Sequence, residues 1–212
     1  MSIIVDRFNK IKSYINNEDI TIIAVSKTFS FDYIAPLIEA GHLHFGENKV
    51  QEAETKWKKL KSEPNKIKLH LIGKLQSNKS KKAVELFDYI HSLDSQKLAD
   101  SLEKYEKSLN KKLKYFIQVN VGMENQKSGI PPNEIDSFYN YCTKEKNLEI
   151  LGLMAIPPND GNEDKHFKFL YEASASLGLK DLSMGMSADY KTAIKYKATH
   201  LRLGSIIFGD RS

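Results

Sequence analysis

Residues 20–27 read ITIIAVSK, a short apolar run rich in β-branched residues that ends in a single lysine. A continuous apolar run of this length is typical of a strand that is buried on both faces, as in a parallel sheet. At the carboxyl end of such a strand, Lys27 would lie on the face of a parallel barrel where ligands bind. Desolvation lowers the pKa of an ammonium group and frees the amine to attack a carbonyl. Lys27 is therefore a candidate for covalent chemistry, although all but three of the 32 basic residues are lysines and most must be ordinary surface residues.

Strand-like and helix-like segments alternate along the rest of the chain. Eight segments read as strands, at residues 20–27, 42–48, 68–73, 89–94, 114–121, 149–157, 181–187 and 199–209. A helical pattern follows each strand but the last, at residues 30–40, 49–61, 76–87, 95–110, 131–146, 165–177 and 188–197. Strict alternation favours parallel strands with crossover helices, and eight units favour a closed (β/α)8 TIM barrel over an open sheet.

An additional helix is predicted before the first strand. Ile4, Phe8, Ile11 and Ile15 recur at helical spacing, which makes the N-terminal segment amphipathic. We expect this helix to cover the base of the barrel or to fill the place in the outer ring where the eighth helix is nearly absent. The whole chain, residues 1–212, then forms one barrel domain.

Composition indicates in which cellular environment the protein occurs. No apolar run is long enough to span a bilayer, and charges interrupt the N-terminal segment every few residues, so no signal peptide is predicted. One cysteine, Cys142, excludes an intramolecular disulfide and fits a reducing cytoplasm, and its helical context indicates a packing residue. Since no long heptad pattern is present, we expect a monomer.

The net charge of +5 raises the alternative of nucleic-acid binding. Arginine, which makes most bidentate contacts to bases and phosphates, is scarce here: Arg7, Arg202 and Arg211 are the three. The densest basic run, residues 74–82 (KLQSNKSKK), could hold a phosphate-rich ligand, but solvated helix faces are the more ordinary explanation of such runs.

The ends of the last two predicted strands carry small and donor-rich residues. Alternation places Ser183, Gly185 and Ser187 on one face, with Ser187 where the next helix begins. A hydroxyl at a helix start can bind an anion, or it can simply cap the helix.

The eighth strand adds Arg202, whose charge in an apolar strand must be paired or functional, and then Gly204 and Ser205. Together the two strand ends indicate a phosphate site. No Walker-type loop or GxGxxG pattern supports a nucleotide site. At the end of the second strand, Asn48 could bond a ligand ring or cap the following helix.

Four histidines raise a second alternative, a metal-dependent hydrolase. His42 and His44 share a face, and His70 and His91 lie on nearby strands. However, His42 and His44 come early in their strand, toward the barrel base and away from the ligand-binding face. We therefore interpret them as packed or hydrogen-bonded side chains.

Seven short segments, spread from the first strand to the last, carry a family resemblance. They are AVSK (24–27), HFGEN (44–48), HLIGKLQSNK (70–79), NQKSGI (125–130), GLMAIP (152–157), SMGMSADY (183–190) and LRLGSIIFG (201–209). On these segments the chain resembles the pyridoxal phosphate homeostasis proteins, the YggS/PROSC family, whose barrel is similar to the N-terminal barrel of alanine racemase. Lys74 departs from this pattern, because many relatives have proline there.

The resemblance implies a cofactor site with a role for each residue. Pyridoxal phosphate would form a Schiff base with Lys27. Ser183 or Ser187, with Gly204 and Ser205, would hold its phosphate. Arg202 would lie beside the pyridine nitrogen and Asn48 beside the ring.

The resemblance also implies a function in cofactor homeostasis, by buffering pyridoxal phosphate and passing it to apo-enzymes, without established catalysis. Racemisation needs an acid/base group on each face of the substrate Cα, and Lys27 could serve only one. In alanine racemase the second group comes from a further domain, which we expect to be missing because the sequence ends after the eighth strand. An arginine beside the pyridine nitrogen also weakens the cofactor as an electron sink. A small alanine-racemase-like amino-acid racemase remains the alternative, to be recognised by turnover.

Overall fold

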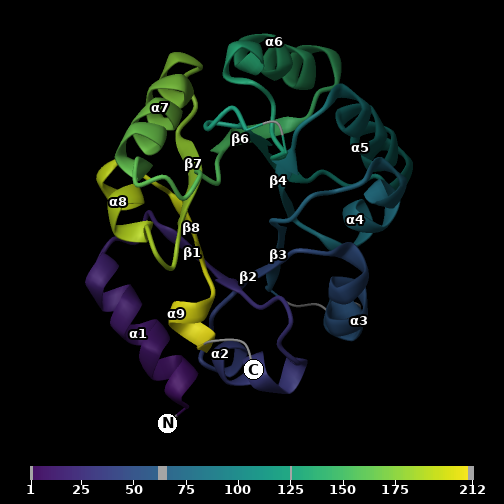
Figure 1. Cartoon of the computed structure of the whole chain (residues 1–212). Coiled ribbons are helices and arrows are strands. Elements are labelled where there is room, and N and C mark those ends of the chain that lie inside the picture. The colour runs from purple at the N-terminus through teal and green to yellow at the C-terminus, as the bar shows by residue number, and fades with distance from the viewer. Residues whose placement is uncertain (1, 62–65, 125, 210–212) are drawn as a thin grey trace.

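Eight parallel strands close into a barrel in the computed structural model, which describes residues 2–61, 66–124 and 126–209 (Figure 1). The strands are β1 (Thr21–Val25), β2 (His44–Glu47), β3 (Lys68–Leu71), β4 (Tyr89–Leu93), β5 (Lys114–Gln118), β6 (Glu149–Met154), β7 (Asp181–Met186) and β8 (His200–Leu203). Each strand pairs with its neighbours in sequence, and β8 pairs with β1 to close the ring. The predicted (β/α)8 TIM barrel is confirmed. Asn125 of the NQKSGI segment and Arg211 lie outside the described residues.

Helices surround the barrel, as Figure 1 shows. They are α1 (Ile3–Ile15), α2 (Phe31–Glu39), α3 (Val50–Lys61), α4 (Ser80–Leu86), α5 (Gln96–Leu109), α6 (Ile135–Asn140), α7 (Glu163–Ser176), α8 (Tyr190–Lys195) and α9 (Ser205–Phe208). Short 3-10 or π turns extend α4 and α6, namely η1 (Ser77–Lys79), η2 (Pro132–Glu134) and η3 (Tyr141–Glu145). Among the described residues, no helix has the length and apolar character that crossing a membrane requires.

The additional helix α1 completes the outer ring. Its buried residues Ile4, Phe8 and Ile11 face the core, as their spacing predicts. Figure 1 shows α1 beside α8 and α9, and the rings of Tyr14 and Tyr190 lie 6.0 Å apart across the contact with α8. Of the two positions considered for this helix, it takes the one that the missing eighth helix would occupy.

The last predicted strand is too long. Residues 199–209 were expected to be extended throughout, but β8 ends at Leu203 and α9 follows at once. The N–H groups of Ile207 and Phe208 both donate to the carbonyl oxygen of Gly204, each at 2.9 Å, which turns the chain into a short helix. A short apolar run does not distinguish a buried strand from a buried helix, so the run IIF gave the wrong assignment.

Burial of β1 on both faces explains the position of Lys27. The residues from Ile22 to Val25 are all buried, with Ile23 and Ala24 fully inaccessible. The strand ends at Val25, so Lys27 lies two residues past it, half-buried at the mouth of the barrel. The apolar run therefore forms the buried strand, and Lys27, which follows it, lies at the carboxyl face of the barrel.

Candidate functional site

A pocket of about 860 Å³ opens at the carboxyl ends of the strands. A volume of this size is typical of a small-molecule site. Every residue predicted for the cofactor site lines it except Ser183, namely Lys27, Asn48, Ser187, Arg202, Gly204 and Ser205. The structure thus brings together residues from β1, β2, β7 and β8 and places Ser183 below them, fully buried.

Lys27 is held in a tight turn. The N–H group of Phe29 donates to the carbonyl oxygen of Ser26 at 3.2 Å, and Thr28 between them has a positive φ of 71°. Non-glycine residues with positive φ are uncommon and mark a constrained backbone. The turn therefore directs Lys27 into the pocket, where it joins Phe29 in the lining.

Glu47 fixes the backbone that precedes Lys27. Its side chain is fully buried, and Oε1 accepts hydrogen bonds from Ser26 Oγ at 2.8 Å, Lys56 Nζ at 2.8 Å and Trp57 Nε1 at 2.9 Å. Lys56 also donates to the carbonyl oxygen of Ser26 at 2.7 Å. This network was not predicted from the sequence, although a carboxylate in the strand segment HFGEN indicates a buried partner for a basic residue.

Arg202 is a buried cation whose hydrogen bonds within the described residues all go to neutral oxygens. Its side chain donates from Nη1 to the carbonyl and hydroxyl oxygens of Ser183, at 2.6 and 2.8 Å, and from Nη2 to the carbonyl oxygen of Ala155 at 2.8 Å. No carboxylate among the described residues forms an ion pair with it. Burial lowers the pKa of Arg202 to about 10, while Asp189 opposes this shift. Because a buried charge without a counterion is costly, this site favours a ligand with negative or electron-rich groups.

The end of β7 does not follow the expected alternation. Gly185 has a positive φ of 93°, and the register between β7 and β8 shifts between Ser183 and Met186. The prediction that Ser183, Gly185 and Ser187 share a face is therefore wrong. Ser183 points into the barrel, and Ser187 lies in the wall of the pocket.

The prediction that Ser187 lies where the next helix begins is also wrong. Helix α8 begins at Tyr190, and the hydroxyl oxygen of Ser187 instead accepts from the N–H groups of Gly204 at 3.2 Å and Ile206 at 3.4 Å. Ser205 lies beside them, exposed in the lining. The hydroxyl of Ser187, which follows β7, thus contacts the turn after β8.

The backbone of Asn48 packs so closely against Gly73 that no other residue fits at position 73 without a shift of the backbone. A Cβ at Gly73 would be 2.3 Å from the carbonyl oxygen of Asn48, which is shorter than any real contact. The first backbone bond of α3 runs from Ala53 to the carbonyl oxygen of Lys49, so Lys49 and not Asn48 occupies the N-cap position. Asn48 therefore does not cap α3. It lines the pocket instead.

The end of β5 and the loop after it form a wall of the pocket that was not predicted from the sequence. Gln118, Asn120, Lys127 and Ser128 line the pocket, and the side chain of Gln118 donates to the carbonyl oxygen of Ser128 at 3.3 Å. The segment NQKSGI was the available signal. Lys74 also lines the pocket, so the departure from the family pattern lies at the site itself.

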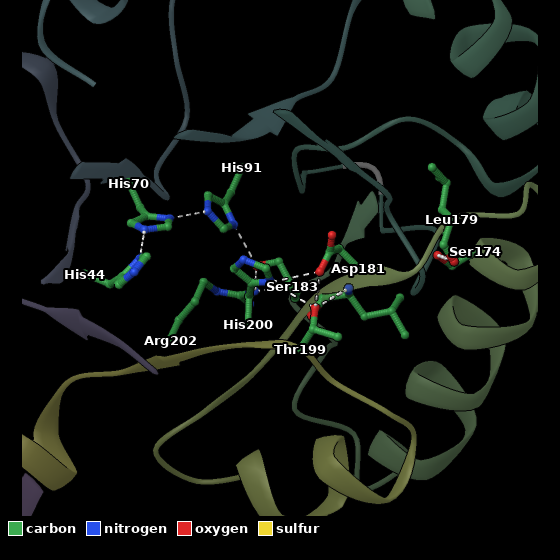
Figure 2. Close-up of polar contacts among 11 residues, drawn as sticks. His44, His70, His91, Ser174, Leu179, Asp181, Ser183, Thr199, His200 and Arg202 are labelled. Atoms are coloured by element: carbon green, nitrogen blue, oxygen red, sulfur yellow. Dashed lines mark hydrogen bonds and ion pairs between the residues drawn. The ribbon is translucent and has the colours of Figure 1, made fainter. Parts of the chain in front are cut away.

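The histidines form hydrogen bonds with one another, as Figure 2 shows. His44 Nδ1 lies 3.0 Å from His70 Nε2, and His70 Nδ1 lies 2.9 Å from His91 Nε2. His42 Nε2 donates to the carbonyl oxygen of His44 at 2.8 Å. The interpretation of these residues as packed or hydrogen-bonded is confirmed. In the described part of the chain, no three His, Cys, Asp or Glu side chains are arranged to hold a metal ion.

Comparison with known proteins relates this site to a family. Residues 2–212 match the family model described as alanine racemase, N-terminal domain. The pyridoxal phosphate homeostasis protein of Escherichia coli K12 is 38% identical over 203 residues, which cover 92% of this chain and 87% of that protein. The protein of the same name from Synechocystis is 38% identical over 201 residues, 91% of this chain and 92% of that one.

Solved structures give the same relationship. PipY of Synechococcus elongatus PCC7942, solved with PLP bound, superimposes with a TM-score of 0.89 at 35% identity and covers 97% of this chain and 100% of PipY. Alanine racemase of Clostridium difficile 630 superimposes with a TM-score of 0.75 at 17% identity, over 98% of this chain and 56% of the racemase. The second likeness shows the shared barrel fold.

Proposed function

The chain belongs to the pyridoxal phosphate homeostasis proteins, within the family of the alanine racemase N-terminal domain, and from this premise we propose that it binds pyridoxal phosphate at the mouth of the barrel. The main support for the proposal is that Lys27 and the buried Arg202 line the same pocket. The residues present suit a ligand that has an aldehyde, an electron-rich ring nitrogen and a phosphate.

Lys27 is the residue to which we assign the covalent bond. An amine condenses with an aldehyde to form a Schiff base, and Lys27 is directed into the pocket by its turn and by the buried Glu47 network behind it. Lys74 and Lys127 also line the pocket, but both come from loops after later strands, and Lys127 is paired with Glu124 at 2.6 Å. The assignment to Lys27 is supported by the turn at Thr28 and by the bond from Lys56 to the carbonyl oxygen of Ser26, which hold its backbone on both sides.

The phosphate is assigned to Ser187, Gly204 and Ser205. The Ser187 oxygen accepts two N–H bonds, so its own proton is available to donate to a phosphate oxygen. A Cβ at Gly204 would meet Val25 only at ordinary contact distances of 3.5 Å and more, so packing within the protein does not require this glycine. We assign Arg202 to the pyridine nitrogen and Asn48 to the ring edge.

Reversible storage and delivery of the cofactor to apo-enzymes is the role we propose for this site. Racemisation would require a second acid/base group across the substrate Cα from Lys27. No His, Tyr, Cys, Asp or Glu side chain is among the described lining residues, and the only ionisable side chains besides those of Lys27 and Arg202 are those of Lys74 and Lys127, which come from loops. We therefore propose a carrier without amino-acid turnover.

Borohydride reduction followed by peptide mapping tests the proposal. After loading with pyridoxal phosphate and reduction, the added mass should lie on Lys27, and a Lys27→Ala variant should carry none. A Lys74→Ala variant is the matched control and should be labelled like the unaltered protein. Label on other lysines, or no label at all, would refute the assignment.

A further inference from the structure

A continuous chain of hydrogen bonds runs through the inside of the barrel to Arg202 (Figure 2). It begins at His44 on β2, passes His70 on β3 and His91 on β4, and reaches the hydroxyl of Ser183 on β7. His91 Nδ1 and Ser183 Oγ are 2.7 Å apart, and Arg202 Nη1 donates to the same Oγ at 2.8 Å. His70, His91 and Ser183 are fully buried, so water does not compete with these bonds.

The chemistry of Arg202 sets the direction of the whole chain. A guanidinium only donates, so Ser183 Oγ accepts from it and keeps one proton to give. Among the described contacts, His91 Nδ1 is the acceptor that receives this proton. His91 then carries its proton on Nε2 and donates to His70, and His70 donates in the same way to His44. In this arrangement every bond has one donor and one acceptor, with all three rings neutral.

Neutral rings agree with the surroundings of the chain. Burial lowers the pKa of His70 and of His91 well below the usual histidine value, and neighbouring histidines lower it further. His91 also stacks on Phe116, with ring centroids 4.4 Å apart. The tautomer of a histidine is set by the bonds that its two nitrogens make, so the proton that Ser183 donates to Nδ1 leaves the proton of His91 on Nε2, facing His70.

We propose that His91 and Ser183 are positioning residues for pyridoxal phosphate, which hold the guanidinium of Arg202 in the orientation that meets the cofactor. This inference rests on the proposed function, because it takes the ligand of Arg202 from there. It also gives Ser183 a role other than phosphate contact. Groups that bind a ligand need support to within about 0.5 Å, and a guanidinium held by neutral acceptors depends on each of them.

Four variants and a matched control test the proposal by binding and absorption. His91→Phe keeps the stack on Phe116 but removes both hydrogen bonds, and Ser183→Ala removes the hydroxyl acceptor of Arg202 while its two carbonyl acceptors remain. Each should weaken binding of pyridoxal phosphate about tenfold and shift the absorption maximum of the bound cofactor and its pH dependence. The double variant should lose no more than either single one, because both act through one contact. His91→Asn, whose amide oxygen can accept from Ser183, should restore most of the affinity.

His200→Phe is the control. His200 is buried in the same interior, with its ring 6.2 Å from that of His91, but it bonds to Thr199 and not to the chain. This variant should bind and absorb like the unaltered protein. Equal losses in His91→Phe and His200→Phe, with equal falls in melting temperature, would show that only the core was damaged and would overturn the proposal.

Binding of pyridoxal, which lacks the phosphate, distinguishes two roles for Ser183: positioning Arg202 and contacting the phosphate. If Ser183 positions Arg202, the Ser183→Ala variant loses the same factor in affinity for pyridoxal and for pyridoxal phosphate. A loss confined to pyridoxal phosphate would overturn the proposal in favour of a phosphate contact.

Nitrogen NMR of the ligand-free protein gives a reading that does not depend on the cofactor. The rings of His44, His70 and His91 should be neutral and protonated on Nε2, and Ser183→Ala should change the Nδ1 shift of His91. A charged His91, or one protonated on Nδ1, would overturn the inference. If the unaltered protein fails to bind pyridoxal phosphate, the proposed function fails, while the NMR result still decides whether the chain supports Arg202.

Discussion

Ser187 accepts a hydrogen bond from the backbone N–H of Gly204 at 3.2 Å and so ties the end of β7 to the turn after β8. The two strands already pair in the barrel, and this contact and the neighbouring bond from Ile206 join the segments that follow them in one surface of the pocket. The phosphate site that we propose is therefore a property of the junction between two strands.

A negative charge at Ser187 tests that junction. In Ser187→Asp, the carboxylate would face the phosphate, and repulsion in a partly dry site should weaken binding of pyridoxal phosphate by more than about tenfold. Pyridoxal should be affected much less. Ser128→Asp places the same charge in the pocket wall formed by the loop after β5 and serves as control. Equal losses for both aldehydes in Ser187→Asp would show that the phosphate binds elsewhere.

Removing the cation beside Glu47 should destabilise the fold. The Lys56 and Glu47 side chains are 11% and 0% exposed, so Lys56→Met leaves a buried carboxylate without its counterion. The free energy of unfolding should fall by about 3–5 kcal/mol, measured by urea denaturation. Lys82→Met removes the exposed pair with Glu54 and should leave the free energy of unfolding almost unchanged. Similar losses in the two variants would contradict the role assigned to the Glu47 network.

Two glycines of the pocket should respond differently to alanine. Gly73→Ala forces the backbone of Asn48 to move and should reduce the free energy of unfolding by about 1–3 kcal/mol. Gly204→Ala meets only ordinary contacts with Val25, so its stability should stay within about 1 kcal/mol of the unaltered protein. Because Gly204 lines the proposed phosphate site, Gly204→Ala should weaken cofactor binding without unfolding the protein. Normal binding by a stable Gly204→Ala variant would remove this glycine from the site.

Acid should destabilise the protein through its buried histidines. Burial lowers the pKa of His200 to about 4, although Asp181 opposes the shift, so in the folded state the ring is neutral over most of the range below its unfolded pKa of about 6.5. The unfolded chain binds more protons in this window, and stability therefore falls as the pH drops from about 6.5 toward 4. Each such histidine contributes up to about 1.4 kcal/mol per pH unit. The stability of His200→Phe should depend less steeply on pH in this window, and an unchanged slope would argue against the shift.

Strand β1 and Lys27 were predictable because an apolar, β-branched run ending in one lysine has few alternative explanations. The barrel followed from the regular alternation of strands and helices. The face of Ser183 was not predictable, since the left-handed backbone at Gly185 breaks the alternation and a sequence does not reveal that φ. The contacts of His44 and His91 depend on how separate strands are staggered in the barrel, which no local pattern contains. Helix α9 was missed because Ile206 to Phe208 fit either kind of element.

Pairing of β1 with β8 sets the order in which the protein can be completed during synthesis. β1 leaves the ribosome before β8, and one of its edges has no partner until β8 follows. Helix α1 likewise completes its contacts in the outer ring of helices only after α9 has formed. Contacts between such distant segments form slowly, and an open strand edge is prone to pair with other chains in the meantime. Ligand residues from β1, β7 and β8 meet only when this seam closes, so a nascent chain has no complete binding pocket until its last strand is in place.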